Sequence, residues 1–172
     1  MSTMSETNTT ADNALLITRT FNAPRTLVWQ AWTQAEQLLH WWGPKGVTMR
    51  VANIDLQPGG RLHYCYEMPN GSVMWGLFLY QEIIAPERLV FTSGFSDTEG
   101  NLIRNPWAPV WPLEILNSYT FSEEDGKTTI EMSGTPYNAT AEEEQAFAQA
   151  KSMIQQGFKG TLDQLEEYLS KA

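Results

Sequence analysis

Cysteine, histidine and basic residues are scarce in this chain of 172 residues. A single cysteine, Cys65, allows no disulfide within the chain, and two histidines leave little material for a metal site, so we expect neither a metal nor another cofactor. Eleven Lys and Arg residues stand against 20 Asp and Glu residues, which gives a net charge of −9. That charge would repel nucleic-acid phosphates and anionic lipids, so we expect no nucleic acid or membrane as a partner.

Long hydrophobic runs are also missing. No stretch approaches the roughly 18–20 apolar residues of a membrane-spanning helix. The polar start, "MSTMSETNTTADN", has neither the basic residues nor the apolar run of a signal peptide. We therefore expect a cytoplasmic protein with a disordered tail at residues 1–13 and one domain at residues 14–172.

Alternating polar and apolar residues, broken by short turns such as "PGG" and "PNG", predict antiparallel strands joined by hairpins. The predicted strands are Leu15–Asn22, Thr48–Leu56, Arg61–Met68, Val73–Ile84, Arg88–Phe95, Leu113–Ser122 and Thr128–Ser133. The segment from residue 96 to 112, rich in Trp and Pro, is predicted to be a long loop without regular structure.

Apolar residues at helical spacing predict two short helices between Pro24 and the Trp41–Trp42 pair, which Gly43-Pro44 must end. A long helix is predicted from residue 139 to 169, where Thr140 and Glu143 form a capping-box pattern. The predicted fold is α+β: a curved antiparallel sheet of about seven strands wraps around the long C-terminal helix, with two short helices after the first strand.

A sheet that grips a helix in this way tends to leave a cavity between them. The aromatic residues are numerous, with seven Trp, seven Phe and six Tyr, so we expect some of them to face this cavity, although each could instead be packed core. The candidate ligand-binding residues are Trp32, Trp41, Trp42, Tyr64, Tyr66, Trp75, Phe91, Trp107, Trp111, Asn117, Tyr119, Phe147, Ile154 and Phe158. Adjacent helical residues point about 100° apart, so one of Trp41 and Trp42 should seal the interior and the other should lie near its rim. Arg104 is a candidate for meeting an anionic head group at the cavity mouth.

Catalytic and metal-binding patterns are weak. His63, Cys65 and Glu67 share one strand face, but residues two apart on a strand lie about 7 Å from each other, and we expect this face to be solvated. A nucleophile would need a positioned base, and the chain has only His40 and His63 and no G-x-S-x-G elbow. We therefore assign no catalytic residue.

Four segments, taken together, resemble one known family. They are "ITRTFNAPRTLVWQAWTQAEQLLHWWGPKG", "NIDLQPGGRLHY", "APERLVFT" and "QQGFKGTLDQLEEYL", and they resemble the activator of heat-shock protein 90 ATPase homologue family. That family belongs to the START-like (SRPBCC, birch-pollen-allergen-like) helix-grip superfamily, and the likeness spans residues 15–170. The chain departs from it at Phe158, where relatives commonly have Trp, and in the long segment at residues 96–112.

The resemblance implies a helix-grip fold whose cavity takes lipids, steroids, polyketides or other hydrophobic molecules. Non-catalytic binding of a hydrophobic or aromatic small molecule is therefore the leading expectation. A cyclase-like or isomerase-like activity in the same cavity is an alternative, because some relatives are aromatases or cyclases. A chaperone ATPase cofactor is disfavoured, because the eukaryotic namesake docks through a separate N-terminal domain where this chain has a 13-residue polar tail. Exposed Trp107 and Trp111 also permit a homodimer.

Overall fold

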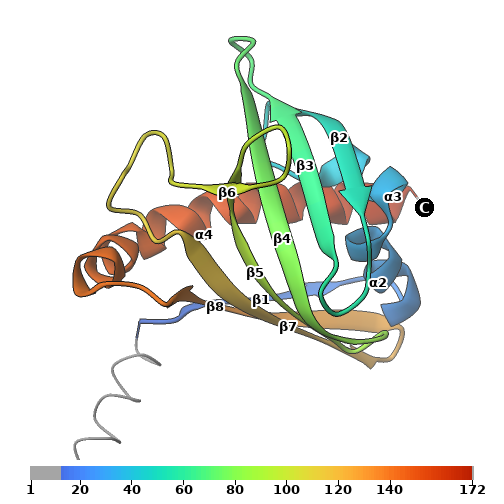
Figure 1. Ribbon diagram of the computed structural model, residues 1–172. Coiled ribbons are helices and arrows are strands. Elements are labelled where there is room, and N and C mark those ends of the chain that lie inside the picture. Colours follow the sequence, from blue (N-terminus) through green and yellow to red (C-terminus); the bar gives the residue numbers. More distant parts are fainter. Residues whose placement is uncertain (1–12, 172) are drawn as a thin grey trace, which may run out of the picture.

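The structure is a computed structural model that describes residues 13–171 and holds three helices and eight strands within them (Figure 1). The expected disordered tail lies outside the described residues except for Asn13. In chain order the elements are β1 (Leu15–Phe21), α2 (Arg25–Thr33), α3 (Ala35–Trp41), β2 (Thr48–Ile54), β3 (Arg61–Glu67), β4 (Val73–Ile84), β5 (Arg88–Ser96), β6 (Leu102–Ile103), β7 (Glu114–Glu124), β8 (Lys127–Tyr137) and α4 (Ala141–Ser170).

All strands belong to one antiparallel sheet in the order β1-β8-β7-β5-β4-β3-β2, with β6 paired to β5. Figure 1 shows the sheet curving around the long α4, with α2 and α3 at one end. The predicted α+β helix-grip architecture is confirmed. The prediction that residues 96–112 lack regular structure was wrong, because β6 places Leu102 and Ile103 opposite Ser96 and Phe95.

Alternation along each strand separates an inner face, turned toward α4, from an outer face. On β3, Leu62 and Tyr64 point inward, whereas His63 and Cys65 point outward. The expectation that this outer face is solvated was wrong for both residues, which are buried. The His63 ring stacks on Trp75 at 4.8 Å, and its Nε2 lies 3.0 Å from Ser96 Oγ.

At one end of the inner face, α2 and α3 fill the space with indole rings. Trp32 and Trp41 meet edge to face with ring centroids 4.7 Å apart, and Trp29 packs against Phe121 in the same manner. All four rings are buried. Edge-to-face pairs add about 0.5–1.5 kcal/mol each beyond their burial, so this end is densely packed core.

The helix α4 begins with the predicted capping box: Thr140 Oγ1 accepts from the Glu143 amide, and the Glu143 carboxylate accepts from the Thr140 amide. Its C-terminal part is embedded in the core through Leu162, Leu165 and Leu169. Between residues 148 and 160 no α4 side chain is fully buried. The helix is therefore anchored mainly by its C-terminal third.

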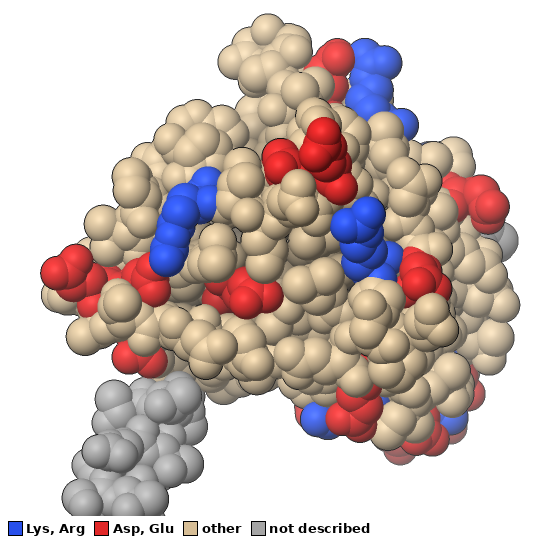
Figure 2. All heavy atoms as spheres, in the orientation of Figure 1, with Lys and Arg blue, Asp and Glu red and all other residues tan. Residues whose placement is uncertain are grey.

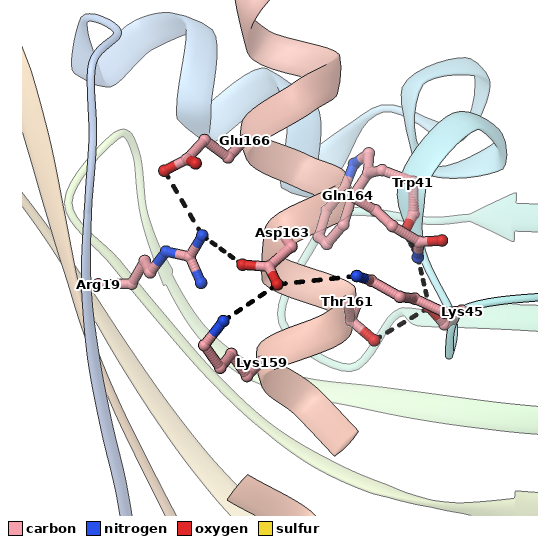
Figure 3. Close-up of polar contacts among 9 residues, drawn as sticks. Arg19, Trp41, Lys45, Lys159, Thr161, Asp163, Gln164 and Glu166 are labelled. Atoms are coloured by element: carbon pink, nitrogen blue, oxygen red, sulfur yellow. Dashed lines mark hydrogen bonds and ion pairs between the residues drawn. The ribbon is translucent and has the colours of Figure 1, made fainter. Parts of the chain in front are cut away.

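Hydrogen bonds tie that anchored part of α4 to the loop after α3 (Figure 3). Thr161 Oγ1 donates to the Gly43 carbonyl at 3.0 Å. Gln164 Nε2 donates to the same carbonyl at 2.8 Å and to the Trp41 carbonyl at 3.1 Å. These bonds satisfy carbonyl groups left free where α3 ends, and they fix the Trp41–Trp42 pair against α4.

Ion pairs reinforce the same junction (Figure 3). Asp163 on α4 pairs with Arg19 of β1 at 2.7 Å and with Lys159 at 3.2 Å, while Lys45 Nζ lies 3.9 Å away. The hydrogen bonds from Arg19 and then Lys159 lower the pKa of the Asp163 carboxyl. One carboxylate thus links β1, the loop after α3, and α4.

Candidate functional site

A cavity of about 290 Å³ lies between the inner face of the sheet and the part of α4 that is not anchored in the core. Phe147, Ile154 and Phe158 border it from the helix side. The sheet side is contributed by β1, β3, β4, β5, β7 and β8. The volume is at the lower end of the range of small-molecule sites.

Aromatic rings form much of the wall. Trp42 meets Tyr64, Phe78 and Phe158 edge to face, with centroids 5.5 to 6.0 Å apart. Phe78 in turn stacks on Phe91 at 4.3 Å. The rings hold one another in place, so the wall is set before any ligand arrives.

The two residues of the Trp41–Trp42 pair lie in different environments, one in the core and one at the cavity. Trp41 is 1% exposed, and its Nε1 donates to the Ala31 carbonyl at 3.0 Å. Trp42 is half-buried and borders the cavity. Trp41 therefore lies in the core, and Trp42 is the member that faces the cavity.

The Tyr64 ring lies directly over Gly76 on the neighbouring strand. A Cβ atom at Gly76 would come within 2.2 Å of Tyr64 Cζ, so only glycine permits this approach. Burial raises the pKa of Tyr64, and the neighbouring Tyr66 raises it further. Burial also raises the pKa of Tyr119, so both phenols are neutral hydrogen-bond donors at physiological pH.

Among the described residues, Asn117 is the one amide side chain that borders the cavity. Its Nδ2 donates to the Ile115 carbonyl at 3.0 Å and to Ser93 Oγ at 2.9 Å, and lies 3.4 Å from the Phe91 carbonyl. These bonds fix the amide on the floor of the cavity, at the centre of the sheet.

Most of the predicted ligand-binding residues come together around this cavity. Those that border it are Trp42, Tyr64, Tyr66, Trp75, Phe91, Trp111, Asn117, Tyr119, Phe147, Ile154 and Phe158. Trp32 and Trp41 lie in the packed core instead, and Trp107 is 64% exposed on the loop after β6, with its ring 6.4 Å from Phe95. Trp75 borders the cavity, but its ring stacks on His63 on the outer face.

Several lining residues were not predicted. They include Leu15, Ile17, Met74, Phe78, Ser93, Phe95 and Met132. A signal was available for the strand residues, because Met74 pairs with Tyr66 and Ser93 pairs with Phe78 across the sheet, which puts them on the same face. Reading that signal requires the strand register, which the sequence alone does not supply.

The mouth of the cavity is formed by the loop between β6 and β7 and the start of α4. Trp111 packs on Phe147 at 5.6 Å, and Arg104 forms an ion pair with Glu143 and donates to the Trp111 carbonyl at 3.3 Å. The hydrogen bond from the Thr140 amide, followed by Arg104, lowers the pKa of Glu143. Arg104 was expected to meet an anionic head group; in this structure its guanidinium is paired with the Glu143 carboxylate.

Charged side chains are missing from the described cavity wall: none of the lining residues in the described part of the chain is Asp, Glu, Lys, Arg or His. Among residues 13–171, no three His, Cys, Asp or Glu side chains lie close enough to hold a metal ion. Nor is any helix in that range apolar and long enough to cross a membrane. On the face drawn in Figure 2, Lys and Arg side chains lie apart from one another and several lie beside Asp or Glu side chains, so the described part of that face presents no continuous positive surface.

Solved structures of bacterial proteins share this architecture. Ms6760 of Mycobacterium smegmatis is 31% identical, with a TM-score of 0.74 over 93% of this chain and 92% of that one. A Staphylococcus epidermidis protein is 25% identical, with a TM-score of 0.74 over 92% of this chain and 90% of that one. NE0264 of Nitrosomonas europaea, at 23% identity and a TM-score of 0.73, covers 94% and 96% and supports the fold alone. No curated protein matches the chain.

The sequence pattern of one family matches residues 22–170, from the end of β1 to the end of α4. This span includes the Trp41–Trp42 loop, the strands that border the cavity other than β1, and the whole of α4. The chain therefore belongs to the family of Activator of Hsp90 ATPase homolog 1-like proteins.

Proposed function

We propose that this protein binds a hydrophobic or aromatic small molecule in the cavity between the sheet and α4, without catalysing a reaction on it. The observation that carries the proposal is the cavity of about 290 Å³ with its wall of aromatic and aliphatic side chains. An apolar ligand gains free energy by leaving water for such a wall, at roughly 25 cal/mol per Å² of apolar surface buried. The helix-grip fold, which is often a ligand-binding fold, is consistent with this function.

The chemistry of the wall favours binding over catalysis. A general acid or base works best with a pKa near the operating pH. The ionisable groups that border the cavity are the tyrosines Tyr64, Tyr66 and Tyr119, and burial raises the pKa of each. A cyclase or isomerase acting here would have to rely on neutral hydrogen-bond donors alone.

The test is a titration with naphthalene, an uncharged aromatic probe, followed by the indole N–H signals in two-dimensional NMR spectra of the full chain. We expect the Trp42 signal to shift with a saturable dependence on probe concentration, while the Trp29 signal, in the packed core, stays in place.

Two variants with the same new side chain control the titration. Ile154→Trp would fill the cavity from α4, and we expect it to abolish the shift. Met153→Trp places the same ring at a neighbouring position that is 75% exposed, and we expect it to bind as the native protein does. No saturable shift in the native protein, or equal shifts in both variants, would rule out the proposal.

A further inference from the structure

Asn117 presents a free hydrogen-bond acceptor to the cavity. Its amide nitrogen can be told from its oxygen because one amide atom faces the Ile115 and Phe91 carbonyls, which only accept hydrogen bonds. That atom must be the nitrogen, Nδ2. The remaining atom, Oδ1, is therefore an acceptor.

This oxygen has no hydrogen-bond partner within residues 13–171, since all the hydrogen bonds of Asn117 involve Nδ2. It is not sealed in the core either: among the described side chains, only the indole nitrogens of Trp32 and Trp42 are both fully buried and unpaired. Gly134 on the adjacent strand has no side chain to cover Oδ1, which lies 3.4 Å from where a Cβ atom would be. The oxygen is thus open to the cavity.

An acceptor in an otherwise apolar pocket selects for a matching donor. A ligand without a donor would strip Oδ1 of water and leave it unpaired, which costs free energy. Tyr119 is two residues along the same strand face, with its Cα atom about 7 Å from that of Asn117. Its hydroxyl has no hydrogen-bond partner within residues 13–171 and adds a second polar point.

The wall also restricts the charge and the size of a ligand. No lining residue carries a charge, and Arg104 at the mouth is paired with Glu143, so an ionised ligand group would be buried without a counter-charge. An apolar cavity of about 150 Å³ holds one benzene ring. The volume here, about 290 Å³, is room for about two rings.

We infer that the ligand is an uncharged aromatic molecule of about two rings with a hydroxyl or N–H group, and that Asn117 Oδ1 accepts the hydrogen bond from that group. This inference rests on the proposed function and adds the class of ligand to it.

The test compares four probes that share one ring system at pH 7: naphthalene, 2-methoxynaphthalene, 2-naphthol and 2-naphthoate. The naphthol is uncharged at this pH, as phenols are. We expect 2-naphthol to bind about five- to tenfold more tightly than 2-methoxynaphthalene, which has the oxygen but no donor. We expect 2-naphthoate to bind more than about a hundredfold more weakly than 2-naphthol, because its carboxylate finds no partner.

Asn117→Leu, which is close to Asn in shape and has no acceptor, should bind 2-naphthol and 2-methoxynaphthalene equally. Tyr119→Phe should keep the preference for 2-naphthol. If Tyr119→Phe loses the preference and Asn117→Leu keeps it, the assignment to Asn117 is wrong.

The four probes also test the inference on the native protein alone, so this result does not depend on whether a variant folds. If naphthalene binds the native protein and 2-naphthol binds no more tightly than 2-methoxynaphthalene, the inference fails while the proposed function stands. If 2-naphthoate matches 2-naphthol, the restriction to uncharged ligands fails. If none of the four binds, the proposed function itself fails.

Discussion

The two ends of the sheet's inner face are built from similar side chains but differ in what covers them. At one end, α2 and α3 add the rings of Trp29, Trp32 and Trp41, and these pack with the last turns of α4 into a solid core. At the other end no short helix is present within residues 13–171, and α4 alone crosses a cavity of about 290 Å³. Stability is therefore concentrated at the filled end, and the hollow end is the proposed ligand site.

The largest expected effect tests the filled end directly. Trp32→Ala removes a fully buried ring that contacts Trp41, Trp42 and Tyr119, and should lower the free energy of unfolding by about 3–5 kcal/mol. Ile154→Ala, at the hollow end, should cost only about 1 kcal/mol, because the side chain is half-buried and alanine favours the helix. Urea denaturation measures the free energy of unfolding of both variants. Equal losses would contradict the difference in stability between the two ends.

A second substitution tests whether the hollow end is as rigid as its stacked rings suggest. Gly76→Ala puts a methyl group against the Tyr64 ring, which must move into the cavity, and should cost about 1–3 kcal/mol and weaken naphthalene binding. Adding Tyr64→Ala to this variant removes the clash, so the two stability changes should not add. Additive changes would show that the ring does not oppose the methyl group.

The junction between the two ends is tested by Thr161→Val, which keeps the shape of the side chain. It removes the hydrogen bond to the Gly43 carbonyl, which still accepts from Gln164, so we expect a loss of about 1 kcal/mol in urea denaturation. Thr161→Ser retains the hydroxyl and should lose clearly less of that hydrogen bond's contribution. A Val variant as stable as the native protein would contradict this role of the hydrogen bond.

The smallest effect concerns the mouth of the hollow end and depends on pH. The folded-state pKa of Glu143 is lowered from the usual 4.5, so its charged form stabilises the protein above that pH and the contribution is lost as pH falls through the lowered value. Glu143→Gln keeps the capping geometry without the charge. We expect the stability difference between native protein and variant, from denaturation across pH 3 to 7, to shrink toward acid; a difference constant with pH would contradict this role.

Periodicity in the sequence predicted the seven long strands and the three helices, because each spans enough residues to show a repeat, and the spacing of Thr140 and Glu143 predicted the capping box. It missed β6, since the two residues Leu102 and Ile103 cannot show an alternation. Periodicity also predicted a solvated face for His63 and Cys65. A period of two separates the two faces of a strand, but it does not show whether another segment covers the polar face.

The candidate site was predictable where one strand face gathers its residues, as with Asn117 and Tyr119. The location of each tryptophan was not predictable, because the sequence does not distinguish an indole in the packed core from one that borders the cavity. Trp32 and Trp42 lie 5.7 Å apart, yet one is core and the other borders the cavity. That difference is set by how α3 ends and how Thr161 and Gln164 hold its last carbonyls, which are contacts between segments more than 100 residues apart.

In mechanical terms, α4 is a beam that is held firmly at both ends and more lightly in between. Leu162, Leu165 and Leu169 embed one end, and the pairing of Glu143 with Arg104 holds the other. The span between residues 148 and 160 is about 20 Å long, and it has contacts of its own, among them the hydrogen bond from Gln155 Nε2 to the Leu16 carbonyl at 3.2 Å and the Phe158 ring against Trp42. With no fully buried side chain in it, this span is the part of the helix that resists bending least.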